Sequence, residues 1–271
     1  MSRDASRGEQ DLDQSRPTLS EREARQVRAL QRRKKRQEEQ RFLAEGIRVV
    51  EDLLASGLQT DWILAASSLE DSPRGVELLA AADRKGIPIR RVAEDEFVRL
   101  AATEHPQGVL AVARIERGTF EAIENARGDS VVLLLDAIQD PGNFGTLTRT
   151  AEALGATAVI ALPGTVDPWN PKSVRAAAGS LFRVPILTCE WEEAARRLRA
   201  ARYRLLAAEA GAEPPRPNDR RVGLVLGNEG AGISPEVRAT VDGTVGIPLR
   251  GRAESLNVAA AAAILLYELT R

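Results

Sequence analysis

The sequence predicts an α/β protein built from two domains, and three observations lead to this prediction. Segments with the apolar pattern of buried strands alternate with segments of helical periodicity, an order typical of parallel sheets covered by helices. A near-continuous apolar run at 131–136, VVLLLD, has the pattern of a strand buried on both faces. A charged stretch, 115–129, separates two such regions, and 271 residues suffice for two moderate domains.

The first region is expected to begin with a disordered segment and a basic helix. Residues 1–20 lack apolar periodicity and are rich in Ser, Asp, Arg and Gln. Ser20 and Glu23 have the spacing of a capping box, so a helix is predicted to begin there and to continue through a basic run towards Glu39. A second amphipathic helix is predicted from an apolar stripe that Gly57 ends, formed by Phe42, Val49, Val50, Leu53 and Leu54.

After Gly57 the first region alternates between short strands and helices. Strands are predicted at 61–65, 87–92 and 109–113, and helices at 75–85 and 95–102. We therefore expect residues 21–114 to form a basic helix and a compact α/β domain. Residues 115–129 are expected to be a linker with a helical piece.

The second region, residues 130–271, continues the same alternation. Its predicted strands are 131–136, 158–162, 184–187, 204–208, 222–226 and 243–247, and its predicted helices are 143–154, 172–178, 190–201, 235–240 and 256–270. Strands spaced by helices in this way predict a parallel sheet with both faces covered.

The composition excludes several classes of protein. The longest apolar-rich stretch, 258–267, is about half of a membrane span, so no transmembrane segment is expected. The N-terminus lacks the charged-then-apolar pattern of a signal peptide, which favours the cytoplasm. One cysteine, Cys189, excludes a disulfide framework, and one histidine, His105, argues against catalytic triads and multi-histidine metal sites. We therefore expect no metal, and chemistry carried by Asn, Ser, Glu, Arg and backbone amides.

Positive charge is concentrated in the first 41 residues. They carry 12 Lys and Arg against 8 Asp and Glu, whereas the rest of the chain carries 26 against 31, and the net charge is −1. Five consecutive basic residues lie in this part of the chain: Arg32, Arg33, Lys34, Lys35 and Arg36. Such a run is either a solvated helix face or an electrostatic contact for phosphates, and composition alone leaves both interpretations open.

Three segments that contain glycine and asparagine follow predicted strands, at the sheet edge where open α/β proteins bind ligands. They are DAIQDPGNFGTLTRTAEALGA at 136–156, LVLGNEGAGIS at 224–234 and IPLRGRAESLNVAAAAAILLYE at 247–268. Taken singly, each has a structural explanation as a turn or a closely packed helix. The glycines at 227, 230 and 232 reverse the dinucleotide fingerprint, and no G-x-x-x-x-G-K-[ST] loop is present. This disfavours a nicotinamide-dependent oxidoreductase and a P-loop nucleotide hydrolase.

In this order and spacing, the three segments resemble the SpoU, or TrmH-like, branch of the SPOUT methyltransferases, which methylate ribose 2′-hydroxyls of ribosomal or transfer RNA. The stretches RRKKRQEEQRFLAEGIRVVEDLL and HPQGVLAVA resemble the RNA-binding domain, similar to ribosomal protein L30e, of many such rRNA enzymes. The resemblance implies a C-terminal parallel sheet with a deep trefoil knot and a smaller L30e-like α/β domain. It also implies a homodimer that binds S-adenosylmethionine and RNA.

The resemblance further implies which residues form the site. The catalytic group corresponds to Asn143, Arg149, Glu229, Ser255 and Asn257, and main-chain groups of Gly227, Ile247 and Leu256 are expected to hold the cofactor. A glycine at 227 makes physical sense, because backbone amides reach a ligand best without a Cβ in the way. The basic residues 32–36 fit contacts that position the RNA backbone.

The sequence leaves some alternatives open. Arg149 either activates the 2′-hydroxyl, as the resemblance implies, or grips the phosphate beside the target ribose, because a guanidinium normally stays protonated. The N-terminal domain favours ribosomal RNA over transfer RNA as the substrate. A non-catalytic RNA-binding ribosome accessory protein is disfavoured, because every residue of the catalytic group is present.

Overall fold

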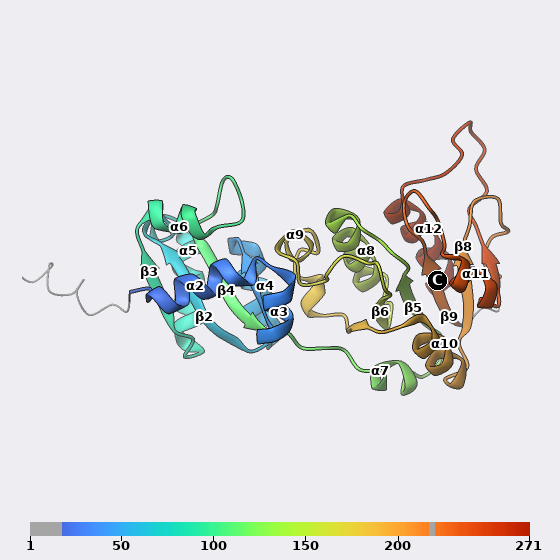
Figure 1. Ribbon diagram of the computed structural model, residues 1–271, viewed down its shortest axis with the longest axis horizontal. Coiled ribbons are helices and arrows are strands. Elements are labelled where there is room, and N and C mark those ends of the chain that lie inside the picture. The colour runs from blue at the N-terminus through green and yellow to red at the C-terminus, as the bar shows by residue number, and fades with distance from the viewer. Residues whose placement is uncertain (1–17, 217–219) are drawn as a thin grey trace, which may run out of the picture. The chain divides into compact units, whose positions relative to one another are not determined.

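The computed structural model describes residues 18–216 and 220–271 of the chain. They form two compact units, which divide between Ile115 and Glu116. Figure 1 shows the helices and strands of both units in chain order, and each unit is described below by itself.

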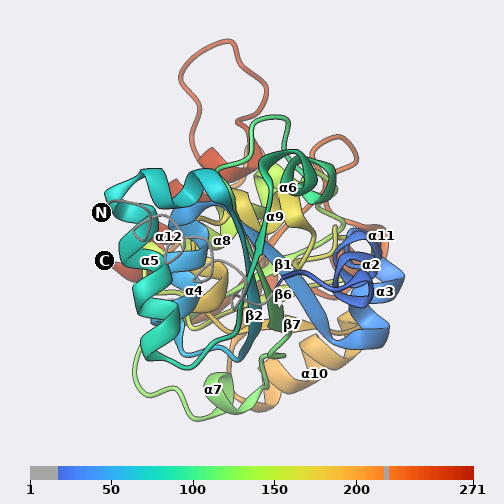
Figure 2. The same cartoon turned by 90° about the vertical axis from the view of Figure 1, so that its left-hand side faces the viewer.

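The N-terminal unit is a mixed four-stranded sheet with helices on both faces (Figure 2). Its elements are α2 (Glu21–Leu30), α3 (Arg33–Glu39), β1 (Arg41–Glu45), α4 (Ile47–Ser56), β2 (Thr60–Ala66), the 3₁₀ helix η1 (Ser67–Asp71), α5 (Pro73–Arg84), β3 (Ile89–Val92), α6 (Glu94–Leu100) and β4 (Val109–Arg114). The strand order is β1-β4-β2-β3, with β4 antiparallel to both neighbours and β3 parallel to β2. Helices α2 and α6 pack on one face through Val27, Leu64 and Phe97, and α4 and α5 cover the other.

The described chain begins inside the segment 1–20, which the sequence predicts to be disordered. The first 17 residues of that segment lie outside the described residues. Thr18 pairs with Arg91 in an isolated parallel bridge. Ser20 and Glu23 form the predicted capping box, in which Glu23 N donates to Ser20 Oγ over 3.2 Å. Residues 18–20 of the segment predicted to be disordered are therefore part of the N-terminal unit.

The single basic helix predicted to run to Glu39 is in fact two helices, so this prediction was wrong. Arg32 has extended backbone angles (φ −98°, ψ 132°) and separates α2 from α3. The buried side chain of Arg36 accounts for the break, because its Nη1 donates to the carbonyl oxygens of Leu30 (2.8 Å) and Gln31 (2.9 Å). These carbonyls lie at the end of α2, where the helix itself supplies no donor.

The second predicted helix also begins later than expected. Phe42 lies on β1, where it pairs with Ala113 of β4, and is not part of a helical stripe. Gly46 ends the strand with a φ of 103°, and α4 begins at Ile47. Gly57 ends α4 with a φ of 82°, as predicted. The apolar spacing thus predicted the helix but not the strand before it. Both elements bury apolar side chains, so Phe42 of the strand extended the apparent stripe of the helix.

The C-terminal unit is a six-stranded sheet in which every pair of neighbouring strands is parallel, as predicted. Its elements are α7 (Glu121–Glu124), β5 (Ser130–Leu135), α8 (Pro141–Ala153), β6 (Ala158–Ala161), α9 (Pro171–Ala176), the 3₁₀ helix η2 (Ser180–Phe182), β7 (Ile186–Thr188), α10 (Trp191–Ala200), β8 (Arg204–Ala208), β9 (Arg221–Leu226), α11 (Pro235–Thr240), β10 (Gly243–Val245) and α12 (Val258–Thr270). The strand order is β10-β8-β9-β5-β6-β7.

Helices cover both faces of this sheet, as Figure 1 shows for α8 and α12 on one side and α10 on the other. The second face is closed by α7, α10 and α11 through a core that includes Leu134, Leu198 and Val237. In the described part of the chain, no helix has the length and apolarity to cross a membrane. The described side chains also include no cluster of His, Cys, Asp and Glu suited to hold a metal ion.

Candidate active site

Two neighbouring strands bring the first two predicted segments together. Strands β5 and β9 pair in parallel with Leu135 opposite Leu226, so the loops that follow them leave the same edge of the sheet. Asp136, at the start of the first loop, accepts a hydrogen bond from Ser234 N at the end of the second (2.7 Å). The two loops are therefore fixed to each other where they leave the sheet.

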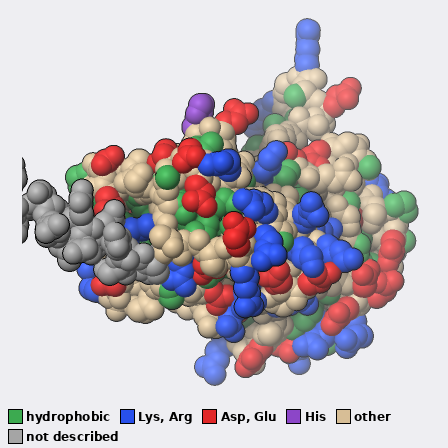
Figure 3. Space-filling view, turned by 60° about the vertical axis from the view of Figure 1, so that its left-hand side comes forward, with side chains coloured by type: hydrophobic (Ala, Val, Ile, Leu, Met, Phe, Trp, Pro, Cys, Tyr) green, Lys and Arg blue, Asp and Glu red, His purple; other side chains and the backbone are tan. Residues whose placement is uncertain are grey.

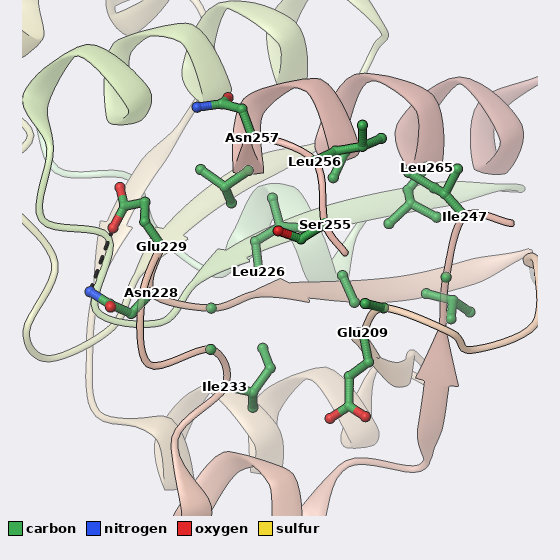
Figure 4. A pocket seen from close by; sticks show the side chains of 18 of the residues that line it. Glu209, Leu226, Asn228, Glu229, Ile233, Ile247, Ser255, Leu256, Asn257 and Leu265 are labelled. Carbon is green, nitrogen blue, oxygen red and sulfur yellow. Dashed lines mark hydrogen bonds between the residues drawn. The ribbon is translucent and has the colours of Figure 1, made fainter. Parts of the chain in front are cut away.

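A pocket of about 570 Å³ opens at this edge (Figure 4). Its size falls within the usual range for small-molecule sites, roughly 300–1,000 Å³. Glu229 and Asn257 lie at one end of the pocket, Ile247 and Leu265 at the other, and Ser255 between them. The lining comprises residues 208–210, 226–230, 232–233, 245–247, 249, 255–258, 261 and 265.

Two of the glycines that line the pocket, Gly227 and Gly246, lie very close to neighbouring main chain. A Cβ at Gly227 would lie 2.3 Å from the carbonyl carbon of Gly232, and a Cβ at Gly246 would lie 2.5 Å from the carbonyl oxygens of Glu209 and Ala212. Both positions therefore require glycine, since no side-chain rotation could relieve a clash with backbone. The two glycines thus allow the loops that line the pocket to pack closely against neighbouring main chain.

Asn143 connects all three predicted segments. It lies in the first turn of α8, and its backbone N–H donates to the N-cap residue Asp140 over 2.7 Å. Its side-chain Nδ2 donates to Glu229 Oε1 (2.8 Å), and its Oδ1 accepts from Asn257 Nδ2 (3.3 Å). Asn257 in turn caps α12 by accepting from Ala259 N (2.9 Å). Three polar side chains from distant parts of the sequence thus form one cluster at the pocket.

Asn228, which was not among the predicted site residues, lines the same pocket. Its Nδ2 donates to the Ala137 carbonyl (2.8 Å), and its Oδ1 accepts from the N–H groups of Gly230 and Ala231 (2.9 Å each). The sequence carries a signal for the local part of this arrangement, because an asparagine two residues before a glycine is typical of a turn closed by its own side chain. The hydrogen bond to Ala137, in the loop after β5, depends on the order of the strands in the sheet, which cannot be predicted from the sequence.

The structure gathers most of the predicted site residues. The pocket lining includes Glu229, Ser255 and Asn257 of the expected catalytic group and all of the expected cofactor residues, Gly227, Ile247 and Leu256. Asn143 lies outside the lining but bonds to two of its members. Arg149 is different, because it is exposed on α8 and does not line the pocket. Six residues further along the helix, it lies about 9 Å from Asn143 along the helix axis.

The basic run in the N-terminal unit is divided between the surface and the core. Arg32, Arg33, Lys34 and Lys35 are exposed, and the hydrogen bond to Glu38 (2.6 Å) raises the pKa of Lys35. Arg36 is only 2% exposed and is used to join α2 to α3. The expectation that Arg36 contacts RNA is therefore wrong, because its guanidinium cannot reach a phosphate from this position.

Cys189 lies beside the core of the C-terminal unit and is partly buried. Burial raises the pKa of its thiol to about 11, and the carboxylates of Glu193 and Glu190 act in the same direction. The thiol therefore stays protonated at neutral pH. This environment is typical of an inert buried cysteine and not of a nucleophile.

Comparisons with known proteins agree with this architecture. The sequence profile of the SpoU rRNA Methylase family matches residues 130–267, and that of an MRM3-like substrate binding domain matches residues 22–111. A 23S rRNA (guanosine(2553)-2′-O)-methyltransferase, RlmP of Bacillus subtilis, is 37% identical over 89% of this chain and 92% of its own length.

Two solved structures are similar over nearly the whole chain. The SpoU methyltransferase AviRb from Streptomyces viridochromogenes, in complex with the cofactor AdoMet, has a TM-score of 0.81 and 30% identity over 93% of this chain and 97% of its own. An AdoMet-bound rRNA methyltransferase from Sinorhizobium meliloti has a TM-score of 0.80 and 29% identity over 93% of this chain and 95% of its own. Together with the profile match, which spans just over half of the chain, these similarities show that the chain belongs to the SpoU rRNA methylase family.

Proposed function

We propose that this protein is an S-adenosylmethionine-dependent methyltransferase that acts on a ribose 2′-hydroxyl of 23S ribosomal RNA. The observation that carries the proposal is the polar cluster of Asn143, Glu229 and Asn257 at one end of a pocket large enough for a small-molecule cofactor. The names of similar proteins, which include 23S rRNA 2′-O-methyltransferases, support ribosomal over transfer RNA as the substrate.

The pocket fits the expected cofactor. Main-chain groups at Gly227, Ile247 and Leu256 are available to a purine, and the apolar side chains of Leu226 and Ile233 offer packing to its rings. S-adenosylmethionine supplies a methyl group that is already activated by its sulfonium, so the protein need only align the accepting oxygen and assist the loss of its proton.

The polar cluster would perform this alignment. Glu229 and Ser255 present oxygens at the pocket, and Asn143 holds Glu229 in place through a 2.8 Å bond. These groups are expected to orient the ribose and to accept its hydrogen bonds. For Arg149 we propose a grip on the adjacent phosphate, because its exposed guanidinium carries several N–H donors in a planar arrangement that matches phosphate oxygens.

A homodimer would bring Arg149 to the pocket, and this too is a proposal. Within one chain Arg149 does not line the pocket. On α12 and the residue before its cap, the large apolar side chains of Leu256, Ile264 and Tyr267 are exposed by 38%, 42% and 56%. An exposed apolar stripe of this kind is typical of a surface that a second subunit covers. We propose that the partner subunit's Arg149 completes each site.

We also propose the deep trefoil knot that the resemblance implies. It is supported by the path of the chain end, because α12 contacts α8 and the central strand β5, although both precede it by more than a hundred residues. The domain division of 21–114, 115–129 and 130–271 is likewise proposed, with the first part binding RNA through the exposed residues Arg32, Arg33, Lys34 and Lys35. Residence in the cytoplasm stays a prediction.

One assay tests the function and separates its alternatives. The protein is incubated with methyl-labelled S-adenosylmethionine and with unmodified 23S rRNA or tRNA, and the labelled RNA is then hydrolysed in alkali. A methylated 2′-oxygen cannot attack the neighbouring phosphate, so we expect label in alkali-resistant dinucleotides from 23S rRNA.

Other outcomes would change the assignment. Label in mononucleotides would indicate base methylation, and label in tRNA alone would identify the alternative substrate. If neither free RNA is labelled, the assay is repeated with large ribosomal subunits. Cofactor binding without label in any of these substrates would favour a non-catalytic RNA-binding protein.

A further inference from the structure

We infer that Asn228 is a positioning residue for the pair formed by Asn143 and Glu229, an inference that rests on the methyl-transfer function proposed above. Asn228 lies two residues beyond the end of β9 and directly before Glu229. Its side chain occupies the point where the loop after β9 passes the loop after β5. Both members of the pair belong to segments that continue from these loops.

The amide group of Asn228 acts on both loops at once. Its oxygen accepts from the N–H groups of Gly230 and Ala231, and its backbone exchanges two 2.9 Å hydrogen bonds with Gly232, so it closes its own loop. Its nitrogen donates to the carbonyl of Ala137 over 2.8 Å, so it also holds the neighbouring loop. Asn suits both functions, because its short side chain presents a donor and an acceptor at once.

The contact with Ala137 is made at a strained point of the backbone. Ala137 has a φ of 57°, a left-handed conformation that is uncommon for a residue with a Cβ. Its Cβ also lies so close to Gly164 that a Cβ there would be 2.9 Å away. Strained conformations persist only where the surrounding structure holds them, and the bond from Asn228 is one such restraint. Three residues further on, Asp140 caps the helix that carries Asn143.

Besides the bond from Ser234 to Asp136 at the sheet edge, two further bonds join the segments that follow β5 and β9. The bond from Asn228 to Ala137 lies near the strands, and the bond from Asn143 to Glu229 (2.8 Å) lies at the pocket. Without the bond from Asn228, the bond at the pocket is the only hydrogen bond among the described residues that joins the loops beyond the contact between Ser234 and Asp136 at the sheet edge. A displacement of reacting groups by about 1 Å can lower a rate about 100-fold, so the consequence should be visible in catalysis.

The test uses the nearly isosteric variant Asn228→Asp. A carboxylate at this position still accepts from Gly230 and Ala231, but it has no proton to donate to the Ala137 carbonyl or to Glu229 Oε2 (3.5 Å), and it repels the Glu229 carboxylate. We expect kcat to fall about 10- to 100-fold, while the Kd for S-adenosylhomocysteine, measured by calorimetry, changes less than about threefold.

Tyr203→Phe is the matched control for stability. It removes the buried hydrogen bonds of the Tyr203 hydroxyl to Ser130 (2.5 Å) and Ile123 (3.2 Å), at the opposite end of β5 from the pocket. We expect it to lower Tm while leaving kcat unchanged at temperatures well below Tm. The inference is overturned if Asn228→Asp keeps kcat within about twofold of wild type, or if Tyr203→Phe loses as much kcat as Asn228→Asp at a comparable decrease in Tm.

A second readout does not depend on RNA methylation. Hydrogen exchange of the peptide that covers residues 136–143 should be faster in Asn228→Asp than in wild type and in Tyr203→Phe. Unchanged exchange would contradict the positioning role. Absence of methyl transfer in wild type, by contrast, would count against the proposed function and would leave the exchange result to decide the role of Asn228.

Discussion

Two segments stand out in this sequence, the basic run 32–36 and the glycine-rich run 227–232, and the structure uses them in different ways. The basic run is divided, since Arg32 to Lys35 are exposed whereas Arg36 is buried and joins two helices. The glycine-rich run acts as one unit, because its backbone and the side chain of Asn228 build a single loop against the pocket. The residues of the glycine-rich run therefore act together, as their closeness in sequence suggests, whereas the residues of the basic run do not.

The difference has a physical origin. A long charged side chain can reach backward or forward by a full turn, so neighbouring arginines in a helix serve different surroundings. Glycine and asparagine act on the backbone within two or three residues, so their roles follow directly from the local sequence. The predictions below test this comparison, from the largest expected effect to the smallest.

The largest effect is expected for Arg149, whose position on α8 is outside the pocket of its own chain. If the partner subunit's Arg149 grips the phosphate beside the target ribose, Arg149→Ala should lower kcat about 100- to 1,000-fold. The Kd for S-adenosylhomocysteine, measured by calorimetry, should change little. Equal losses in both quantities would contradict the proposed role.

Arg196→Ala is the control for this substitution. Arg196 is exposed on α10, which covers the other face of the same sheet. Its replacement by alanine removes one positive charge, as Arg149→Ala does. We expect wild-type methyl transfer. A mixed dimer of Arg149→Ala with a chain that lacks Glu229 would sharpen the test, because only the shared-site arrangement restores one intact site per dimer.

The second effect concerns Gly227, where a Cβ would lie 2.3 Å from the main chain of Gly232. Gly227→Ala must displace the loop, and overpacking costs up to about 3 kcal/mol. We expect the affinity for S-adenosylhomocysteine to fall about 100-fold, which corresponds to this cost. Gly251→Ala, in the next loop but with no atom within 4 Å of the added Cβ, should bind normally. Similar affinities for both variants would show that cofactor binding does not require the close approach of Gly227 to Gly232.

Much of the C-terminal unit could be predicted from sequence, because each strand of a parallel sheet buried on both faces is an apolar run, and turn residues separate the runs. The same pattern placed the three glycine- and asparagine-containing segments after strands, whereas Gly227, Glu229, Ser255 and Asn257 within them were identified through the resemblance to the SpoU family. The strand order is set by tertiary contacts, so the bond between Asn228 and Ala137 could not be predicted. In the N-terminal unit, β1 was missed because Phe42 fits a helical stripe and a strand equally well.

The third effect tests the buried member of the basic run. Arg36→Ala removes two hydrogen bonds from a guanidinium to the carbonyls that end α2, at 2.8 and 2.9 Å. Hydrogen bonds to charged groups contribute about 1.5–3 kcal/mol, so the free energy of unfolding should fall by about 2 kcal/mol. Thermal unfolding of the N-terminal unit should begin about 10 °C lower. A variant as stable as wild type would mean that α2 ends at Leu30 without help from Arg36.

The smallest effect is expected for Arg33→Ala, which changes an exposed neighbour in the same run. Stability should be unchanged within about 0.5 kcal/mol, but the slope of log Kd for 23S rRNA fragments against log salt should fall by about 1 if Arg33 contacts a phosphate. Arg84→Ala is the control, because Arg84 is exposed at the end of α5 and has the same charge. An equal change in slope for both variants would mean that the N-terminal unit attracts RNA through its overall charge. A change for Arg33 alone would show that α3 is a defined contact, and that one charged run contains both an RNA-binding surface and a structural arginine.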